Sequence, residues 1–429
     1  MIRDFCKLSG QTFDVLVCGG GIYGAWTAYD AALRGLKVAL VDQGDWAQAT
    51  SSASSKLVHG GLRYLETLDV KLVKKALKER QMLMQAAPHR VWPLRFGIPV
   101  FADSRLGNVQ LKIGLALYDF LAGISHTKTA HQYLSKARFA QRFPAVDTTQ
   151  LSNGFTYLDA QTDDARLVLE IVAGALAAGA ACVNYCQVAD IKQQDRHRYT
   201  ATVQDKINSQ TALIVAKQVV NTIGQWTGAV HEHQLSKGVH LILPKILNDE
   251  ALLLTAKADG RVFFIIPWYG RTLLGTTDTY YSGAIDALSV SQEDIDYLLS
   301  AANWVLKTVA WTPADIIGQF VGLRVLKANH KNSPSGASRD WQLVGSENGV
   351  LHSIGGKLTS AREDAAQIVD RLCADLAIKQ PSQTDGRAFP WRPAADYAIW
   401  HPLAMAQAVT LGVDRESAHW LLSRHGNRI

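Results

Sequence analysis

The chain has 429 residues, which at about 150 residues per domain predicts two or three packed lobes and excludes a single small binding module. Hydrophobic residues make up 48% of the chain and charged residues 19%, so the chain can fill a large core and is neither disordered nor fibrous in composition. The formal net charge of +6 is modest for this length, which argues against a dedicated nucleic-acid binder and leaves anionic small molecules or an anionic membrane surface as partners.

The first elements predict a strand, a tight turn and a helix. Residues 13–18 (FDVLVC) form a short apolar run, the segment GGGIYG follows at residues 19–24, and residues 25–33 have the composition of a helix. A second strand is predicted over residues 37–41 and ends on Asp42. Strand, helix and strand in this order favour a right-handed parallel unit that binds a dinucleotide.

Three glycines of this turn have separate expected roles. Gly19 allows the tight turn, Gly21 lets the backbone approach a pyrophosphate, and Gly24 lets the helix pack closely on the strand. The helix N-terminus attracts an anion, and Asp42 can accept hydrogen bonds from a ribose.

A run of small polar residues, TSSASSK, occupies residues 50–56, and HGGLRY follows at residues 59–64. The first run alone also fits a flexible linker. However, His59, Arg63 and Tyr64 place a titratable group, a cation and a phenol beside two glycines, and small residues let a backbone lie close to a ligand. A structural histidine remains an alternative interpretation of His59.

Two helices are predicted next. Residues 70–86 carry Lys71, Lys74, Lys75 and Lys78 on the polar side, which favours a solvated face over a lipid-binding one. Residues 110–124 are more apolar and predict a core or interface helix.

The first domain is expected to resume further along the chain. A helix is predicted over residues 167–178, and strands over 183–188, 199–203 and 212–220. Gly224 follows the last strand and is expected near the ligand of the first glycine turn. The nucleotide-binding domain is therefore discontinuous in sequence.

From residue 240 the pattern changes to short strands, predicted over residues 240–243, 252–255, 261–268 and 272–275. Consecutive strands predict a largely antiparallel sheet and a second lobe. An amphipathic helix over residues 291–305 has Ser291 as candidate N-cap and Asp294 three positions on. A second glycine turn, Gly355 and Gly356 followed by Lys357, then leads from a strand into a helix over residues 359–376.

The five cysteines are odd in number and lie in apolar surroundings, which argues for a reducing compartment. Cys182 and Cys186 are expected in one buried strand over residues 180–188, and His231 with His233 in a connecting loop, so no metal site is expected. The N-terminus lacks an apolar signal segment, and charges interrupt the longest apolar stretches. We therefore expect neither secretion nor a membrane span.

Several of these segments together resemble a known family. GGGIYGAWTA, TSSASSKLVHGGLRYLE, DDARLVLE, NTIGQW, LLGTTDTYY, GLRVL and GGKLTSAR are similar to the FAD-dependent glycerol-3-phosphate dehydrogenases of the D-amino-acid-oxidase superfamily. The similarity runs in order from about residue 13 to about residue 362, and TSSASSKLVHGGLRYLE is its most specific segment.

The resemblance implies an α/β fold: a discontinuous Rossmann-like FAD-binding domain, a mainly antiparallel β-sheet substrate domain and a short helical C-terminal segment. The FAD-binding domain would comprise residues 1–90, 150–235 and 340–385, and the substrate domain residues 91–149 and 236–339. Residues 386–429 would be a truncated form of the family's helical C-terminal domain.

The resemblance also implies which residues hold FAD. The pyrophosphate would meet the first glycine turn, Asp42 the adenosine ribose, and Val188 the adenine end. The implied cofactor-binding residues are Gly19, Gly21, Gly24, Asp42, Thr50, Ser51, Ser52, Ser55, Lys56, Leu57, Val188, Gly224, Gly355, Gly356 and Leu358.

The substrate would lie between the flavin and the antiparallel sheet, against Arg63, Tyr64, Thr276, Thr277 and Lys357. Oxidation of a secondary alcohol needs a base for the hydroxyl proton and positive charge for the growing alkoxide and the phosphate. The preferred base is His59, with His240 as second choice, because an unperturbed imidazole has a pKa of roughly 6.5. Arg324 is assigned to alkoxide stabilisation.

The predicted function is oxidation of sn-glycerol 3-phosphate to dihydroxyacetone phosphate, with electrons passed to a quinone or another acceptor. One alternative keeps FAD and changes the substrate to another phosphorylated or anionic alcohol or amine. A second is a non-catalytic FAD-binding protein. A cytoplasmic location is expected, with peripheral contact to the cytoplasmic membrane left open; the oligomeric state is not predicted.

Overall fold

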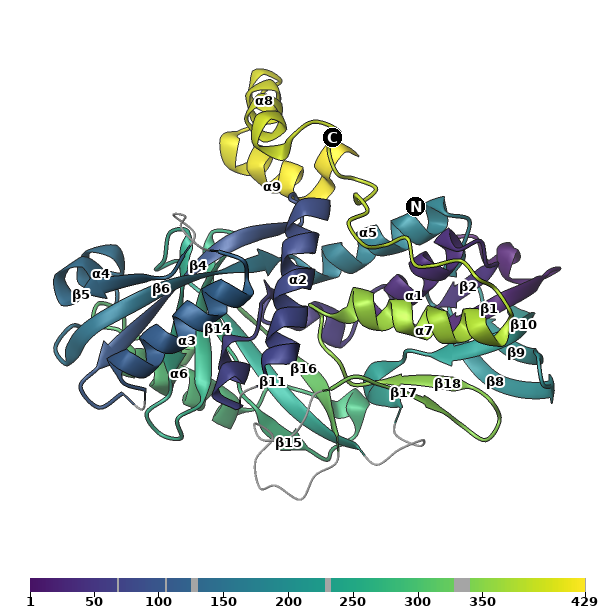
Figure 1. The fold of residues 1–429 in the computed structure, drawn as a ribbon, viewed down its shortest axis with the longest axis horizontal. Coiled ribbons are helices and arrows are strands. Elements are labelled where there is room, and N and C mark those ends of the chain that lie inside the picture. The colour runs from purple at the N-terminus through teal and green to yellow at the C-terminus, as the bar shows by residue number, and fades with distance from the viewer. Residues whose placement is uncertain (68, 105, 125–129, 228–232, 328–339, 429) are drawn as a thin grey trace.

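The computed structural model describes residues 1–67, 69–104, 106–124, 130–227, 233–327 and 340–428. The described residues form two sheets side by side, each with its own helices, and two C-terminal helices project from the same edge of both (Figure 1). The predicted α/β architecture of a Rossmann-like part beside a mainly antiparallel part is confirmed.

The first sheet has a parallel centre in the order β18-β10-β1-β2-β7, and β17, β8 and β9 are added antiparallel. Its strands are β1 (Thr12–Cys18), β2 (Val38–Val41), β7 (Ala181–Val183), β8 (Cys186–Asp195), β9 (Arg198–Asp205), β10 (Thr211–Asn221), β17 (Gln342–Gly345) and β18 (Leu351–Ile354). The central strands are apolar runs because both of their faces are buried.

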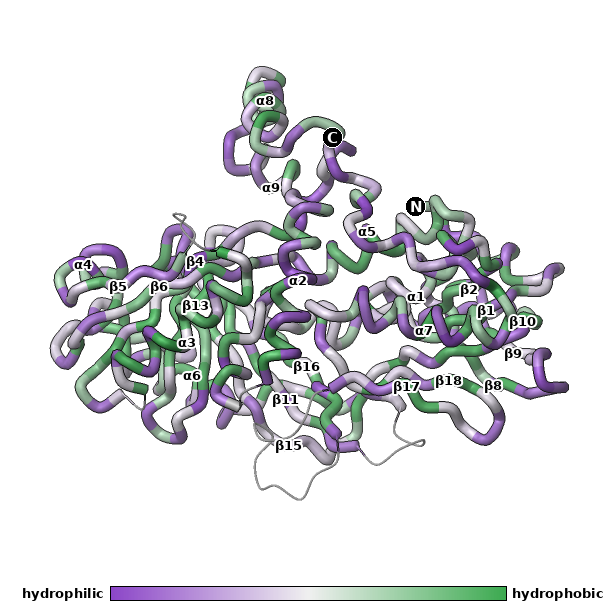
Figure 2. The backbone as a smooth tube through the Cα atoms, viewed as in Figure 1, coloured by the Kyte–Doolittle hydropathy of each residue, from purple (hydrophilic) through white to green (hydrophobic). Residues whose placement is uncertain are grey.

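The helices of the structure that carry most of the packing are α1 (Ile22–Leu33), α2 (Val70–Ala86), α3 (Asn108–Leu121), α4 (Lys136–Arg142), α5 (Asp164–Ala177), α6 (Gln292–Val305) and α7 (Ala361–Asp375). In the first lobe, α1 packs between α5 and α7 through buried side chains such as Trp26, Ile171 and Ile368. Figure 2 colours α7 alternately hydrophilic and hydrophobic, as expected for a helix with one buried face.

The second sheet follows the order β15-β11-β14-β13-β12-β4-β6-β3, with β16 beside β11 and β5 beside β6. Its strands are β3 (Leu57–Val58), β4 (Val91–Phe101), β5 (Gln132–Ser135), β6 (Leu151–Thr162), β11 (His233–Leu243), β12 (Glu250–Thr255), β13 (Val262–Trp268), β14 (Arg271–Gly275), β15 (Thr279–Tyr281) and β16 (Gly318–Lys327). Every pairing is antiparallel except that of β4 with β12. Helix α6 covers one face, with Ser291 and Asp294 forming the predicted capping box.

The sheet topology differs from the predicted domain division at β3 and β6. Both lie in the second sheet, although the division assigned residues 1–90 and 150–235 to the first domain. β6 was not predicted as a strand because its residues are buried on both faces and show no polar–apolar alternation. It pairs with β4 from Val91 to Phe101, so it belongs to the second sheet.

The single strand expected over residues 180–188 is wrong. β7 ends at Val183 and β8 begins at Cys186, because Tyr185 takes a positive φ of 50° and the chain turns there. The N–H groups of Tyr185 and Cys186 donate to the carbonyl oxygens of Gly44 and Asp42. The turn therefore folds back on the end of β2.

The predicted connecting loop that contains His231 and His233 is only partly described. His233 begins β11, and His231 lies outside the described residues.

The predicted solvated face of α2 is only partly exposed. Nζ of Lys75 lies 2.6 Å from a carboxylate oxygen of Asp364 and 3.6 Å from Glu363, both on α7. Lys78 lies 3.5 Å from Asp385 in a mostly exposed pair. Two of the four lysines therefore attach α2 to the first lobe.

The C-terminal segment contains α8 (Tyr397–Thr410) and α9 (Arg415–His425). A buried ionic cluster attaches it to the body: Glu170 accepts from Arg90, His89 and the backbone N–H of Trp391, while Arg90 also donates to the carbonyl oxygen of Ser423. Among the described helices, none has both the length and the apolar character needed to cross a membrane.

The two lobes meet at Asp164, the first residue of α5, which follows directly on β6. Its carboxylate accepts from Nζ of Lys56 at 2.6 Å, and from the backbone N–H and hydroxyl of Ser54 at 3.1 and 2.7 Å. Both charged side chains are buried, and the Lys56 ammonium also lies 4.9 Å from the centre of the Phe320 ring on β16. This ion pair therefore joins the loop after β2, the start of α5 and the second sheet.

We predict that Lys56→Met lowers the free energy of unfolding by about 3–5 kcal/mol, because it leaves a buried carboxylate without its cation. Denaturant unfolding of the purified protein measures this. The control is Lys192→Met, since Lys192 forms a 3.3 Å pair with Asp190 at an exposed position, where removal should cost less than about 1 kcal/mol. Equal effects of the two substitutions would contradict the assignment.

Candidate functional site

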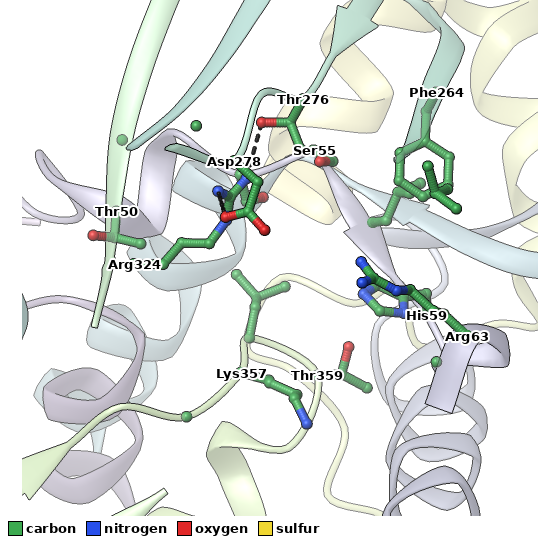
Figure 3. Close-up of a pocket in the computed structure, with 18 of the residues that line it drawn as sticks. Thr50, Ser55, His59, Arg63, Phe264, Thr276, Asp278, Arg324, Lys357 and Thr359 are labelled. Carbon is green, nitrogen blue, oxygen red and sulfur yellow. Dashed lines mark hydrogen bonds and ion pairs between the residues drawn. The ribbon is translucent and has the colours of Figure 1, made fainter. Parts of the chain in front are cut away.

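A cavity of about 1840 Å³ lies between the two sheets. It is larger than the roughly 300–1,000 Å³ of an ordinary small-ligand pocket, so it has room for an extended cofactor and a second small molecule. First-lobe residues such as Gly19, Asp42 and Val188 line one end, and second-sheet residues such as Thr276 and Arg324 line the other. Figure 3 shows the second end, where side chains from several elements point into the same space.

The first glycine turn lies at the N-terminus of α1. Gly19 and Gly21 line the cavity, whereas Gly24 does not. A Cβ on Gly24 would collide with the carbonyl oxygen of Gly19 and the hydroxyl of Thr222, so this glycine serves the close packing of α1 on the sheet, as predicted. The N–H of Ile22 donates to the Ser51 hydroxyl at 2.9 Å, which fixes the polar run against the start of the helix.

Asp42 lines the cavity at the end of β2. Its carboxylate accepts from the N–H groups of Gly20 at 2.5 Å and Gly44 at 2.8 Å. Burial raises the pKa of Asp42, and these two hydrogen bonds oppose the rise. A carboxylate offers about four acceptor positions, so acceptor capacity remains for a ribose.

The polar run is only partly exposed to the cavity. Thr50, Ser51, Ser55 and Leu57 line it, but Ser52 and Lys56 do not. The Thr50 hydroxyl donates to the carbonyl oxygen of Leu323 on β16 at 2.7 Å, and Lys56 turns away toward Asp164. The expected direct contact of Lys56 and Ser52 with a cofactor therefore does not fit their positions.

The second glycine turn closes the cavity from the other side. The cavity is lined by all four residues of this turn, Gly355 to Leu358. Gly224, which follows β10, lines it as well. Gly355 and Gly356 have φ values of 72° and 97°, which favour glycine. Figure 3 shows Lys357 and Thr359, which follow these glycines, among the side chains that line the cavity.

Arg324 projects from β16 into the second-sheet end of the cavity, which is the expected substrate end (Figure 3). Its guanidinium donates to the Thr276 hydroxyl at 2.9 Å and the Thr277 carbonyl oxygen at 3.2 Å, and it pairs with Asp278 at 3.3 Å. The side chain is 22% exposed, toward the cavity it lines. These contacts hold the positive charge in a defined orientation.

Three more predicted residues line this end of the cavity. His59 lies in the loop directly after β3, and Arg63 and Tyr64 lie in the short helix η3 (Leu62–Thr67). In Figure 3 the His59 and Arg63 side chains lie together, across the cavity from Arg324. Nζ of Lys357 lies 4.2 Å from the centre of the Tyr64 ring. The structure thus brings the three predicted cations and His59 to one end of one cavity.

His240 and Thr277 lie behind the cavity lining. Nε2 of His240 lies 2.9 Å from the Ser55 hydroxyl, and burial together with the charges of Arg324 and Lys56 lowers the His240 pKa well below its usual value. The Thr277 hydroxyl accepts from the N–H of Val239. His240 therefore lies behind Ser55 and does not line the cavity, whereas His59 does.

Among the acids of the cavity lining, sequence reasoning missed Asp278 and Asp159. Asp278 pairs with Arg324, and Asp159 accepts from the N–H of Gly60, the Tyr118 hydroxyl and Arg80. An acid directly after Thr276 and Thr277 was a usable signal for Asp278. Asp159 had no such signal, because β6 was not recognised.

The lining fits the FAD that the sequence resemblance implies. A Cβ on Gly21 would lie 3.1 Å from the Ser51 hydroxyl, a tight contact, so glycine suits the close approach of Ser51 to the helix N-terminus, which attracts an anion such as a pyrophosphate. Asp42 lies at the end where a ribose would be held, and the turn at Gly355 lies at the opposite end beside the cations. Ser51, Asp42 and the two glycine turns are thus the groups that would hold the cofactor.

Comparison with known proteins agrees with this geometry. The family model described as FAD dependent oxidoreductase matches residues 14–362. A glycerol-3-phosphate dehydrogenase of Synechocystis sp. is 35% identical over 406 residues, covering 89% of this chain and 73% of the relative. An aerobic glycerol-3-phosphate dehydrogenase of Bacillus subtilis is 36% identical over 380 residues, covering 86% of this chain and 68% of the relative.

Among solved structures, the glycerol-3-phosphate dehydrogenase of Bacillus halodurans complexed with FAD is similar with a TM-score of 0.80 at 30% identity. The similarity covers 98% of this chain and 77% of that one. The resemblance seen in the sequence motifs is confirmed, and FAD is the cofactor of the matched family. Since the family model spans most of the chain and the relatives are matched over more than two thirds of their length, this chain belongs to the FAD dependent oxidoreductases.

Proposed function

We propose that this chain oxidises sn-glycerol 3-phosphate to dihydroxyacetone phosphate with bound FAD. The observation that carries the proposal is the convergence of Arg63, Arg324, Lys357 and His59 on one end of the cavity. The names of the Synechocystis and Bacillus relatives support the same substrate.

The charge of this end suits a phosphorylated alcohol. A phosphate dianion needs several cations, and the planar fork of arginine can bind two of its oxygens at once. We assign Arg63, Tyr64 and Lys357 to the phosphate, and Arg324 to the alcohol oxygen. Because Thr276 and Asp278 already hold Arg324, its charge is in place before the alkoxide develops.

The hydroxyl proton needs an acceptor on the cavity lining. We assign this role to His59, because it lies on the lining whereas His240 lies behind Ser55. Bound FAD supplies the acceptor for the hydride that leaves the secondary carbon. The chain holds the carbon–hydrogen bond toward the cofactor and removes the proton, so the alcohol loses two electrons and two hydrogens and becomes a ketone.

We predict that sn-glycerol 3-phosphate added without oxygen bleaches the visible absorption of the oxidised flavin, whereas glycerol, which lacks the phosphate, does not at the same concentration. Anaerobic titration of the FAD-loaded protein measures this. A panel of other anionic alcohols and amines tests the alternative substrates. A flavin that no donor reduces would support the non-catalytic alternative and contradict the proposal.

We predict that His59→Gln slows flavin reduction by about 10²–10⁴-fold, because the proton loses its positioned acceptor. Stopped-flow absorbance with saturating substrate measures the rate, and retained FAD stoichiometry shows that the site is intact. His197→Gln, in the exposed turn between β8 and β9, is the control and should reduce at the wild-type rate. If His59→Gln also reduces at that rate, His59 is not the base.

We also propose that the electrons pass to a membrane quinone. Helix α3 supports this proposal, because Val109, Ile113 and Phe120 lie along it and are 71%, 64% and 77% exposed. Residues spaced by four and seven share one helix face, and Ile113 also lines the cavity. An exposed apolar stripe beside a cavity is suited to a lipid surface and to an apolar acceptor.

We predict that Ile113→Asp combined with Phe120→Asp reduces both binding to phospholipid vesicles and reduction of a long-chain quinone in them by at least about ten-fold, because two charges now oppose burial in lipid. Vesicle sedimentation and quinone absorbance measure the two effects. Ile207→Asp, another exposed apolar position, is the control. Unchanged vesicle binding of the double variant would contradict the quinone assignment. Reoxidation of the reduced wild-type flavin by oxygen, with peroxide formation, faster than by the quinone would also contradict it.

A further inference from the structure

A buried hydrogen-bond chain runs from the surface of α2 to the second glycine turn. It begins at Lys75, whose ammonium lies 2.6 Å from Oδ1 of Asp364 on α7. Oδ2 of Asp364 accepts from the Tyr23 hydroxyl at 2.7 Å and from the Ser360 hydroxyl at 3.0 Å. The Tyr23 oxygen in turn accepts from the backbone N–H of Lys357 at 3.0 Å. Three helices thus contribute to the position of one turn.

The charges give this chain a fixed direction. An ionised carboxylate only accepts hydrogen bonds, so the Tyr23 proton must point to Asp364, and a lone pair is left for Lys357. Burial and the nearby Asp364 charge raise the pKa of Tyr23 well above its usual value, so the phenol keeps that proton. Burial alone would lower the pKa of Lys75, but the hydrogen bond and charge of Asp364 raise it, so the cation persists.

This hydrogen-bond chain matters for the turn because the turn lies between two cavities. Gly356 and Lys357 line the large cavity on one side and a small pocket of about 170 Å³ on the other. These two residues therefore have open space on both sides, and Gly355 and Gly356, which lack a Cβ, can leave the positive φ values found here more easily than other residues. A Cβ on Gly356 would collide with the Tyr23 hydroxyl, so the turn and this side chain are in direct contact.

The position of this turn decides where the Lys357 charge lies. Its ammonium lies over the Tyr64 ring at the substrate end, where the flavin ring and the phosphate would meet. A nearby cation stabilises the negative charge that a reduced flavin gains, so its placement tunes the reduction potential. A shift of the turn would move this cation relative to the cofactor.

We propose that Tyr23, oriented by Asp364 and Lys75, is a positioning residue that fixes the Gly355–Leu358 turn and thereby sets the reduction potential of the bound flavin. Tyr23 acts through the backbone of Lys357 and takes no proton from the substrate. This inference rests on bound FAD and does not depend on which alcohol is oxidised.

The test is Tyr23→Phe, which removes the acceptor of the Lys357 N–H and keeps the ring. We expect amide exchange in a peptide containing Lys357 to accelerate by about five-fold or more, the equivalent of one lost hydrogen bond. We also expect the flavin reduction potential, measured against a reference dye, to become more negative. Tyr29→Phe is the control, because Tyr29 lies on the same helix and stacks on Trp26 away from the cavity lining.

Two further variants keep the proposal testable if Tyr23→Phe does not fold. Lys75→Met and Asp364→Asn should shift exchange and potential in the same direction and by less, since Tyr23 itself remains. Wild-type exchange and potential in the folded variants would overturn the proposal. Because neither readout uses the substrate, failure of glycerol 3-phosphate to reduce the wild-type flavin would refute the proposed function alone.

Discussion

The buried ion pair between Asp164 and Lys56 is the interaction on which the site most depends. Asp164 lies at the point where the chain leaves the second sheet at β6 and enters α5 of the first lobe. By accepting from Lys56 and Ser54, it holds the loop that carries Ser55 and Leu57 to the cavity. Burial raises the pKa of Asp164, while Lys56 and Ser54 favour its ionised form. Because Lys56 also lies 4.9 Å from the centre of the Phe320 ring on β16, this buried ion pair holds the loop between the start of α5 and the second sheet.

At the second-sheet end of the cavity, Arg324 and Lys357 are also held in place by neighbouring groups. Arg324 is held by Asp278 and Thr276, Lys357 lies over the Tyr64 ring, and the turn beneath Lys357 is held by Tyr23. Arg324 and Lys357 are therefore each placed by groups on other elements. Such preorganised charge stabilises developing negative charge without rearrangement of the site, which is the electrostatic requirement of alcohol oxidation.

Much of the fold could be predicted from local patterns. The helix over residues 70–86 matches α2, the first glycine turn lies between β1 and α1 as expected, and the cap of α6 has the predicted partners. β6 escaped prediction, because a strand that is buried on both faces lacks the period-two alternation that identifies a half-buried strand. Its place in the second sheet was therefore not part of the predicted domain division.

For the site residues too, local sequence patterns predict the residue types, whereas contacts between distant segments decide which side chains face the cavity. The sequence by itself determined which chemical groups are present: glycine turns suited to an anion, Asp42 suited to a ribose, and His59, Arg63, Arg324 and Lys357, which we assign to an anionic alcohol. Only the tertiary structure decided that Lys56 and His240 lie behind the cavity lining, and that Asp278 and Tyr23 contribute to it. The reason is physical: the residue types follow from local chemistry, but the facing direction of a side chain depends on sheet pairing and buried charges from segments more than 100 residues away, such as the Asp164 that draws Lys56 out of the cavity.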